Sequence, residues 1–92
     1  MSEPITAPLD FQARVLDELI RARANFPRRF ASFHEALAVI EEEVAEFRAW
    51  VYRRDVERVP ELMLAELVQI AAMAQRAAED IITRGDGDGH DL

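Results

Sequence analysis

The chain has 92 residues, no cysteine and a net charge of −7 at pH 7. This length fits one small domain, the lack of cysteine excludes disulfides and thiolate zinc sites, and the negative charge argues against binding to nucleic-acid phosphates. Half of the residues are hydrophobic, but no run approaches the roughly 18–20 apolar residues of a membrane span. The N-terminal residues have neither the basic start nor the apolar core of a signal segment. We therefore expect a soluble, cytoplasmic protein without a membrane partner.

The first helix is predicted from about Leu9 to Asn25, after a flexible leader of residues 1–8 that lacks hydrophobic periodicity. Apolar residues recur at intervals of three and four, which marks one face of a helix. These residues are Phe11, Val15, Leu19, Ala22 and Phe26. Pro27 disfavours the helical conformation in the residue before it, so the helix should end there.

A second helix is predicted to start at Phe33. Ser32 and Glu35 have the spacing of a capping box, in which the serine caps the helix and the glutamate lies in its first turn. The apolar residues that follow alternate in steps of four and three, a repeat suited to packing against another helix. They are Phe33, Leu37, Ile40, Val44, Phe47 and Val51.

The opposite side of this helix carries an acidic stripe, which we define as Glu35, Glu42 and Glu46. At 100° per residue, these three positions lie within about 40° of one another. Glu43 lies between the stripe and the apolar band, whereas Glu41 falls outside the stripe and is expected to be an ordinary surface charge.

The third helix is predicted from about Glu61 to Thr83, with Pro60 at its start. It is apolar almost all round and should be buried on most sides. A charged connection, Arg53–Val59, precedes it and has room for a short helical turn, and a flexible acidic tail, residues 85–92, follows it. We therefore predict an all-α bundle of three long helices plus a short one, in a single domain of residues 9–84. Dimerisation, or assembly into a homotetramer, would complete its core.

Glu66 is the most unusual polar residue of the third helix, because its neighbours are apolar. A buried carboxylate needs a partner, a shifted pKa or a metal. If the second and third helices pack antiparallel, Glu66 faces the acidic stripe, and a hard cation such as Mg²⁺ or Mn²⁺ would satisfy the converging carboxylates. Two alternatives remain: the stripe is solvated and paired with Arg48, Arg53 and Arg54, or Glu66 pairs with Arg76.

Two motifs carry a resemblance to a known family. Residues 42–46 have the sequence E-E-V-A-E, and residues 66–69 have the sequence E-L-V-Q. Over residues 30–83 the chain resembles the MazG-like superfamily of all-α nucleoside triphosphate pyrophosphohydrolases. In that family, E-E-x-x-E and E-x-x-D on two helices bind Mg²⁺, and the enzyme cleaves an NTP or dNTP to the monophosphate and pyrophosphate. The chain departs from the pattern at Gln69, where the family has aspartate.

The resemblance implies specific roles for the matching residues. The implied metal ligands are Glu42, Glu43, Glu46, Glu66 and Gln69, of which the glutamine offers a neutral oxygen. Glu42 and Glu43 are the candidate catalytic residues, because a carboxylate of the cluster would orient the attacking water or accept its proton.

The nucleoside triphosphate would also need residues that bind its phosphates and its base. The substrate-binding candidates are Arg53, Arg54 and Arg76 for the phosphates and Trp50 for the base. The alternatives are surface or ion-pair roles for the arginines and a dimer interface for Trp50. For the whole chain, the alternative function is a non-catalytic MazG-like helical assembly or nucleotide-binding protein.

Overall fold

The computed structural model describes residues 8–53 and 59–83 of the chain. They form three α-helices and a π-helical last turn: α1 (Pro8–Asn25), α2 (Phe33–Val51), α3 (Pro60–Ala77) and η1 (Ala78–Thr83). The predicted all-helical class with three packed helices is thereby confirmed. The predictions for residues 1–7, for a turn at 54–58 and for the tail at 85–92 lie outside the described residues.

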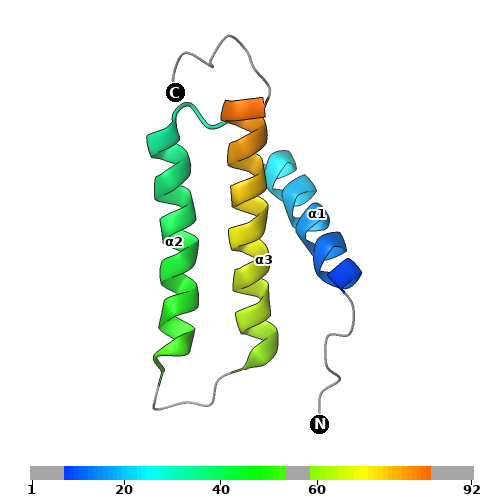
Figure 1. Cartoon of the computed structure of the whole chain (residues 1–92), viewed down its shortest axis with the longest axis vertical. Helices are drawn as coiled ribbons and strands as arrows, with labels where there is room; N and C mark the ends of the chain where they lie inside the picture. The colour runs from blue at the N-terminus through cyan, green and yellow to red at the C-terminus, as the bar shows by residue number, and fades with distance from the viewer. Residues whose placement is uncertain (1–7, 54–58, 84–92) are drawn as a thin grey trace.

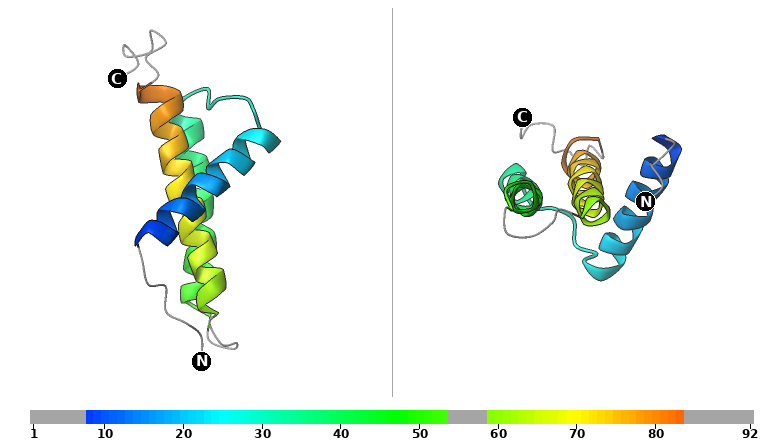
Figure 2. Two further views of the ribbon diagram at one scale, coloured as in Figure 1. Left: turned by 90° about the vertical axis from the view of Figure 1, so that its right-hand side faces the viewer. Right: turned by 90° about the horizontal axis from the view of Figure 1, so that it is seen from below.

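α3 lies between the other two helices (Figure 1). α2 and α3 run side by side and antiparallel, whereas α1 crosses the other side of α3 at a steep angle (Figure 2). The antiparallel arrangement is the one that places Glu66 opposite the second half of α2. Within the described ranges, no helix combines the length and apolarity needed to cross a bilayer.

The start of α2 follows the predicted cap with one difference. The Ser32 hydroxyl accepts the Glu35 N–H at 3.1 Å, as a capping box requires. The Glu35 carboxylate, however, accepts the N–H of Ala31 at 2.6 Å, one residue before the expected partner. Pro60 begins α3 as predicted, at a position where its missing N–H costs no helical hydrogen bond.

The core lies where α1 crosses α3. The predicted apolar face of α1 packs there, with Val15, Leu19 and Ala22 buried and Phe11 partly buried. Phe26, beyond the last residue of the helix, is 70% exposed. The buried residues of this core are Val15, Leu19 and Ala22 of α1 and Val68, Ala72 and Met73 of α3.

α2 meets the rest of the protein through one edge of its predicted apolar band and through residues outside that band. Ile40 of the band packs against the core, together with Val39, which does not belong to the band, and Ala36, also outside it, is buried. Leu37, which we expected to pack, is 54% exposed. The reason is that α3 contacts one edge of the band, so the other edge faces away from both neighbouring helices.

A buried arginine fixes the connection between α1 and α2. Arg76 of α3 is 4% exposed, and its Nη2 donates to the carbonyl oxygens of Phe26 and Arg28, the latter at 2.8 Å. Its guanidinium also lies over the Phe30 ring, 5.1 Å from the centroid. These contacts attach the connection to α3 rather than leaving it as a loose loop.

Asp80 completes this attachment from η1. Its fully buried carboxylate accepts the Phe30 N–H at 3.0 Å and lies 3.0 Å from Nη2 of Arg23 and 3.5 Å from Nε of Arg76. Burial alone would raise the pKa of Asp80, but the Phe30 N–H and Arg23 outweigh it and lower the pKa. The charged carboxylate is therefore part of the stable fold, and it joins α1, α3 and the connection.

Candidate metal centre

A groove of about 790 Å³ runs between the three helices. Its acidic part lies along the second half of α2 and the first half of α3, and its other part lies against the connection fixed by Arg76. The polar side chains of the acidic part are Glu18, Arg21, Glu42, Glu43, Glu46, Glu66 and Gln69. Those nearer the connection are Asn25, Arg28, Glu35 and Arg76, together with the rings of Phe26 and Phe30.

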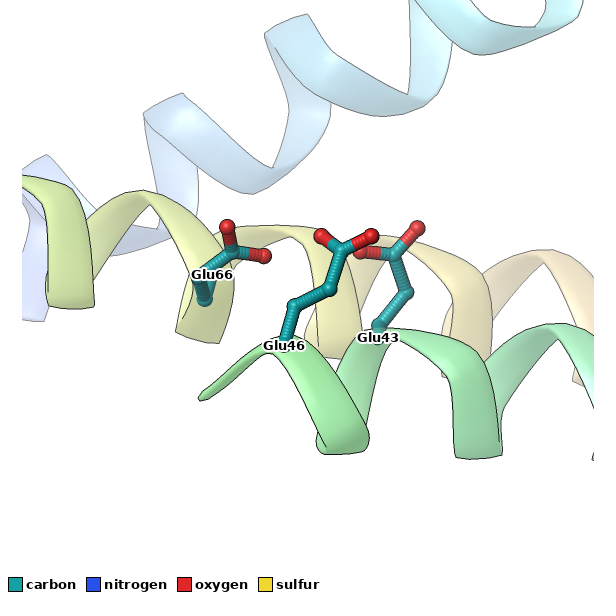
Figure 3. Close-up of side chains that lie close together, drawn as sticks. All are labelled: Glu43, Glu46 and Glu66. Carbon is teal, nitrogen blue, oxygen red and sulfur yellow. The ribbon is translucent and has the colours of Figure 1, made fainter. Parts of the chain in front are cut away.

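Three carboxylates converge in the acidic part of the groove, and we call Glu43, Glu46 and Glu66 the carboxylate triad. Each contributes one oxygen, and these oxygens lie within 4.8 Å of one another. Glu43 and Glu46 are neighbours on the helix surface because they are three residues apart. Glu66 joins them from the antiparallel α3, and all three carboxyl groups point to the side on which α1 passes (Figure 3).

The triad lacks a cationic partner among the residues that the structure describes. The Oε1 atom of Glu66 is buried and has no hydrogen-bond partner. Among the described residues, no ion pair involves Glu43, Glu46 or Glu66. The alternative of a Glu66–Arg76 pair is not what the structure contains, because Arg76 contacts Asp80 instead.

The clustering disfavours the ionised state of these groups. Burial raises the pKa of Glu66, and a hydrogen bond with Glu46 and the charge of that residue raise it further. Burial also raises the pKa of Glu43, followed by the charges of Glu46, Glu66, Glu42 and Glu18. The groove therefore holds negative charge that the described part of the protein leaves uncompensated.

The donor set of the triad fits a hard divalent cation. Mg²⁺ prefers carboxylate oxygens at about 2.1 Å, so two ligands of one ion lie no more than about 4.2 Å apart. Contraction of the triad from 4.8 Å to this range requires only small side-chain rotations, and Glu46 is exposed and free to make them. The unpartnered, buried Oε1 of Glu66 is the kind of atom that such an ion would satisfy.

The other predicted ligands lie close to the triad. Glu42 is exposed and Gln69 is half-buried, and both line the same groove. The structure therefore brings all five predicted ligands to one groove and joins three of them in the triad.

The predicted substrate-binding residues are more scattered. Arg53 lies over the Trp50 ring, 4.8 Å from its centroid, at the end of α2, and neither residue lines the groove. Arg76 lines the groove, but its guanidinium is occupied by the connection and Asp80. Arg54 lies outside the described residues.

α1 contributes two residues that sequence motifs did not indicate, Glu18 and Arg21. The Glu18 side chain is 13% exposed and Arg21 pairs with it. A signal was present, since Glu18 lies three residues after Val15 and four before Ala22, on the apolar face of its helix. A carboxylate at that position has to face either the core or a cavity beside it.

Comparisons of the chain with models of protein families, with curated proteins and with solved structures found no match. Function is therefore inferred from the two motifs and from the groove itself. In chemical terms, the groove combines the converging carboxylates of the triad, arginine side chains and an exposed aromatic ring, Phe26.

Proposed function

We propose that this protein is a Mg²⁺-dependent nucleotide pyrophosphohydrolase, which cleaves an NTP or dNTP to the monophosphate and pyrophosphate. The observation that carries the proposal is the convergence of the triad, Glu43, Glu46 and Glu66, within 4.8 Å in a shared groove. The volume of about 790 Å³ also lies in the range of ligand sites, roughly 300–1,000 Å³. Mn²⁺ has the same ligand preference and would serve in place of Mg²⁺.

The carboxylates have two tasks, cation binding and proton transfer, and Glu43 is a candidate for both. Glu43, Glu46 and Glu66 would hold the cation, and Glu42 and Gln69, which line the same groove, are the further candidate ligands. When bound, the cation supplies charge neutralisation at the phosphate oxygens and lowers the pKa of water. Glu42 or Glu43 orients the attacking water and accepts its proton as the new bond to the α-phosphorus forms. The bond from the α-phosphorus to the bridging oxygen breaks, and pyrophosphate leaves.

Because Gln69 stands where the E-x-x-D pattern has aspartate, this site has one negative charge fewer than the pattern. The Gln69 amide oxygen is a neutral ligand, so the cation is held mainly by the triad. We therefore expect weaker binding of Mg²⁺ than a fourth carboxylate would give, or the loss of the second of two ions. The substitution Gln69→Asp would supply the missing carboxylate.

Release of pyrophosphate tests the proposal. A panel of NTPs and dNTPs is incubated with Mg²⁺ or Mn²⁺, and the wild type is compared with Glu46→Gln and with the control Glu41→Gln, which changes an exposed glutamate outside the groove. We expect turnover in the wild type and the control and its loss in Glu46→Gln. Equal rates in all three proteins would exclude this site. Nucleotide binding without turnover in the wild type would favour the non-catalytic alternative.

The same proposal includes self-association and a cytoplasmic location, where nucleoside triphosphates and Mg²⁺ occur together. The support for a homodimer or tetramer is the uncovered edge of the α2 band, where Leu37 is 54% exposed. A second copy that packs there would bury it, as isologous interfaces do. Light scattering during size exclusion should report a dimer or tetramer that Leu37→Glu dissociates. A monomeric wild type would contradict this part of the proposal.

A further inference from the structure

The arginines that line the groove differ in what their guanidinium groups already bind. Arg76 is buried and donates to carbonyl oxygens of the connection. Arg28 is held by Glu35, with its Nη2 2.6 Å and its Nη1 3.4 Å from the two carboxylate oxygens. Arg21 lines the same groove as the triad and is 59% exposed. Arg21 is paired with a glutamate, as Arg28 is, and it is the one arginine that α1 contributes to the described lining of the groove.

Glu18 fixes the orientation of Arg21. The Nε of Arg21 donates to Oε1 of Glu18 at 3.0 Å, and its Nη2 donates to Oε2. This two-point contact holds the plane of the guanidinium, which a single contact would not. The Nη1 group makes no hydrogen bond with the described residues, so its N–H donors remain available on the side away from Glu18.

A polyphosphate that enters this groove meets mostly carboxylates. A bound cation offsets part of their repulsion, but each phosphate oxygen that the cation does not contact still needs a donor. Arginine is the side chain that supplies several donors and a fixed positive charge to such oxygens. Arg21 lines the same groove as the triad and has donors left, whereas Trp50 and Arg53 lie outside the groove.

We propose that Arg21, positioned by Glu18, binds the phosphate chain of the nucleotide. This inference rests on the proposed function, because it assigns the phosphate contact of the same groove. Arg21 thereby takes the phosphate-binding role that the sequence suggested for Arg76, whose guanidinium instead holds the α1–α2 connection and Asp80. A simpler role for the Glu18–Arg21 pair is that of an ion pair on the helix surface, worth little to stability and nothing to binding.

Steady-state kinetics with the best-cleaved triphosphate distinguish the two roles. Arg21→Gln is compared with Arg14→Gln, which removes an exposed arginine of the same helix that does not line the groove. We expect Arg21→Gln to lower kcat/KM by roughly 10- to 100-fold, the range for loss of a charged hydrogen bond, with an unchanged circular dichroism spectrum. Arg14→Gln should match the wild type.

The positioning role of Glu18 has its own readout. Glu18→Gln should raise KM by less than Arg21→Gln does, and the double variant should be no worse than Arg21→Gln alone, because Glu18 acts through Arg21. Additive losses would show that Glu18 contributes separately and would overturn its role as a positioning residue.

Binding of inorganic pyrophosphate in the presence of Mg²⁺, measured by calorimetry, separates this inference from the proposed function. Turnover in the wild type with equal constants in Arg21→Gln would overturn the inference and leave the function intact. Pyrophosphate binding that Arg21→Gln weakens, in a wild type that cleaves no triphosphate, would support the inference and refute the function. A wild type that neither binds pyrophosphate nor cleaves nucleotides would overturn both.

Discussion

Replacement of Glu66 by glutamine should stabilise the protein in the absence of metal. The substitution keeps the shape of the side chain but removes one charge from the triad, in which Glu66 has no cationic partner among the described residues. The new amide can also donate a hydrogen bond to Glu46, which the ionised carboxylate cannot do. A glutamate retained only for stability would give the opposite result.

The expected gain follows from the geometry of the triad. At a separation of 4.8 Å, two unit charges repel by about 0.9 kcal/mol in water and about 3.5 kcal/mol at an effective dielectric constant of about 20. The oxygens are only partly shielded from solvent, so we expect a gain in unfolding free energy of about 1–2 kcal/mol. For a domain of this size, the melting temperature rises by roughly 4–8 °C for each kcal/mol.

The pH dependence has a defined direction. Because the pKa of Glu66 is raised in the folded protein, the wild type is relatively most stable below the unfolded value of about 4.3. It loses stability as the pH rises through the raised pKa. Glu66→Gln escapes this loss, so its advantage should be present at pH 7 and should disappear in acid.

Thermal denaturation in a metal chelator measures the gain, with Glu41→Gln as the matched control that should leave the melting temperature unchanged. Addition of Mg²⁺ should then stabilise the wild type by mass action and Glu66→Gln much less. If Glu66→Gln melts at or below the wild-type temperature at pH 7 without metal, the carboxylates do not repel one another and the account of the groove is wrong.

Further substitutions test the fold and the donor set. Asp80→Asn should cost about 3 kcal/mol in urea denaturation, because it leaves the buried Arg76 without a partner charge, whereas Arg23 keeps Glu79. Because the pKa of Asp80 is lowered, this deficit should be full above about pH 3.9 and shrink as the pH falls further. Ser32→Ala should cost about 1 kcal/mol through loss of the α2 cap, measured by thermal denaturation. Gln69→Asp should tighten Mg²⁺ binding in calorimetry and lower the melting temperature of the metal-free protein.

Local patterns in the sequence were enough to predict the helices. Ser32 and Pro60 mark helix starts through chemistry that acts within one turn, and Val15 and Leu19 repeat with the helical period, so these features could be recognised without tertiary information. Leu37 could not be placed in this way. Its exposure depends on which edge of α2 contacts α3, a choice that the spacing of apolar residues does not determine.

The part of the candidate site that could be predicted is the part where the two motifs meet across the antiparallel helices α2 and α3. Glu46 and Glu66 could be assigned to one cluster because the pairing of adjacent helices brings them together. The position of Glu18 on the apolar face of its helix was a local signal, but its place in the groove with Arg21 depends on the steep crossing of α1 over α3, which no local pattern encodes. Arg76 was predicted to bind phosphate or to pair with Glu66, whereas its bonds to the α1–α2 connection arise from the path of that connection and required the structure.

The central claim is that Glu43, Glu46 and Glu66 together hold a divalent cation. Titration with Mn²⁺, followed by electron paramagnetic resonance of the free ion, tests it without any requirement for turnover. The account predicts saturable binding in the wild type, competition by Mg²⁺, loss of the site in Glu46→Gln and retention in Glu41→Gln. Binding of equal strength in all three proteins, or no saturable binding in the wild type, would contradict it.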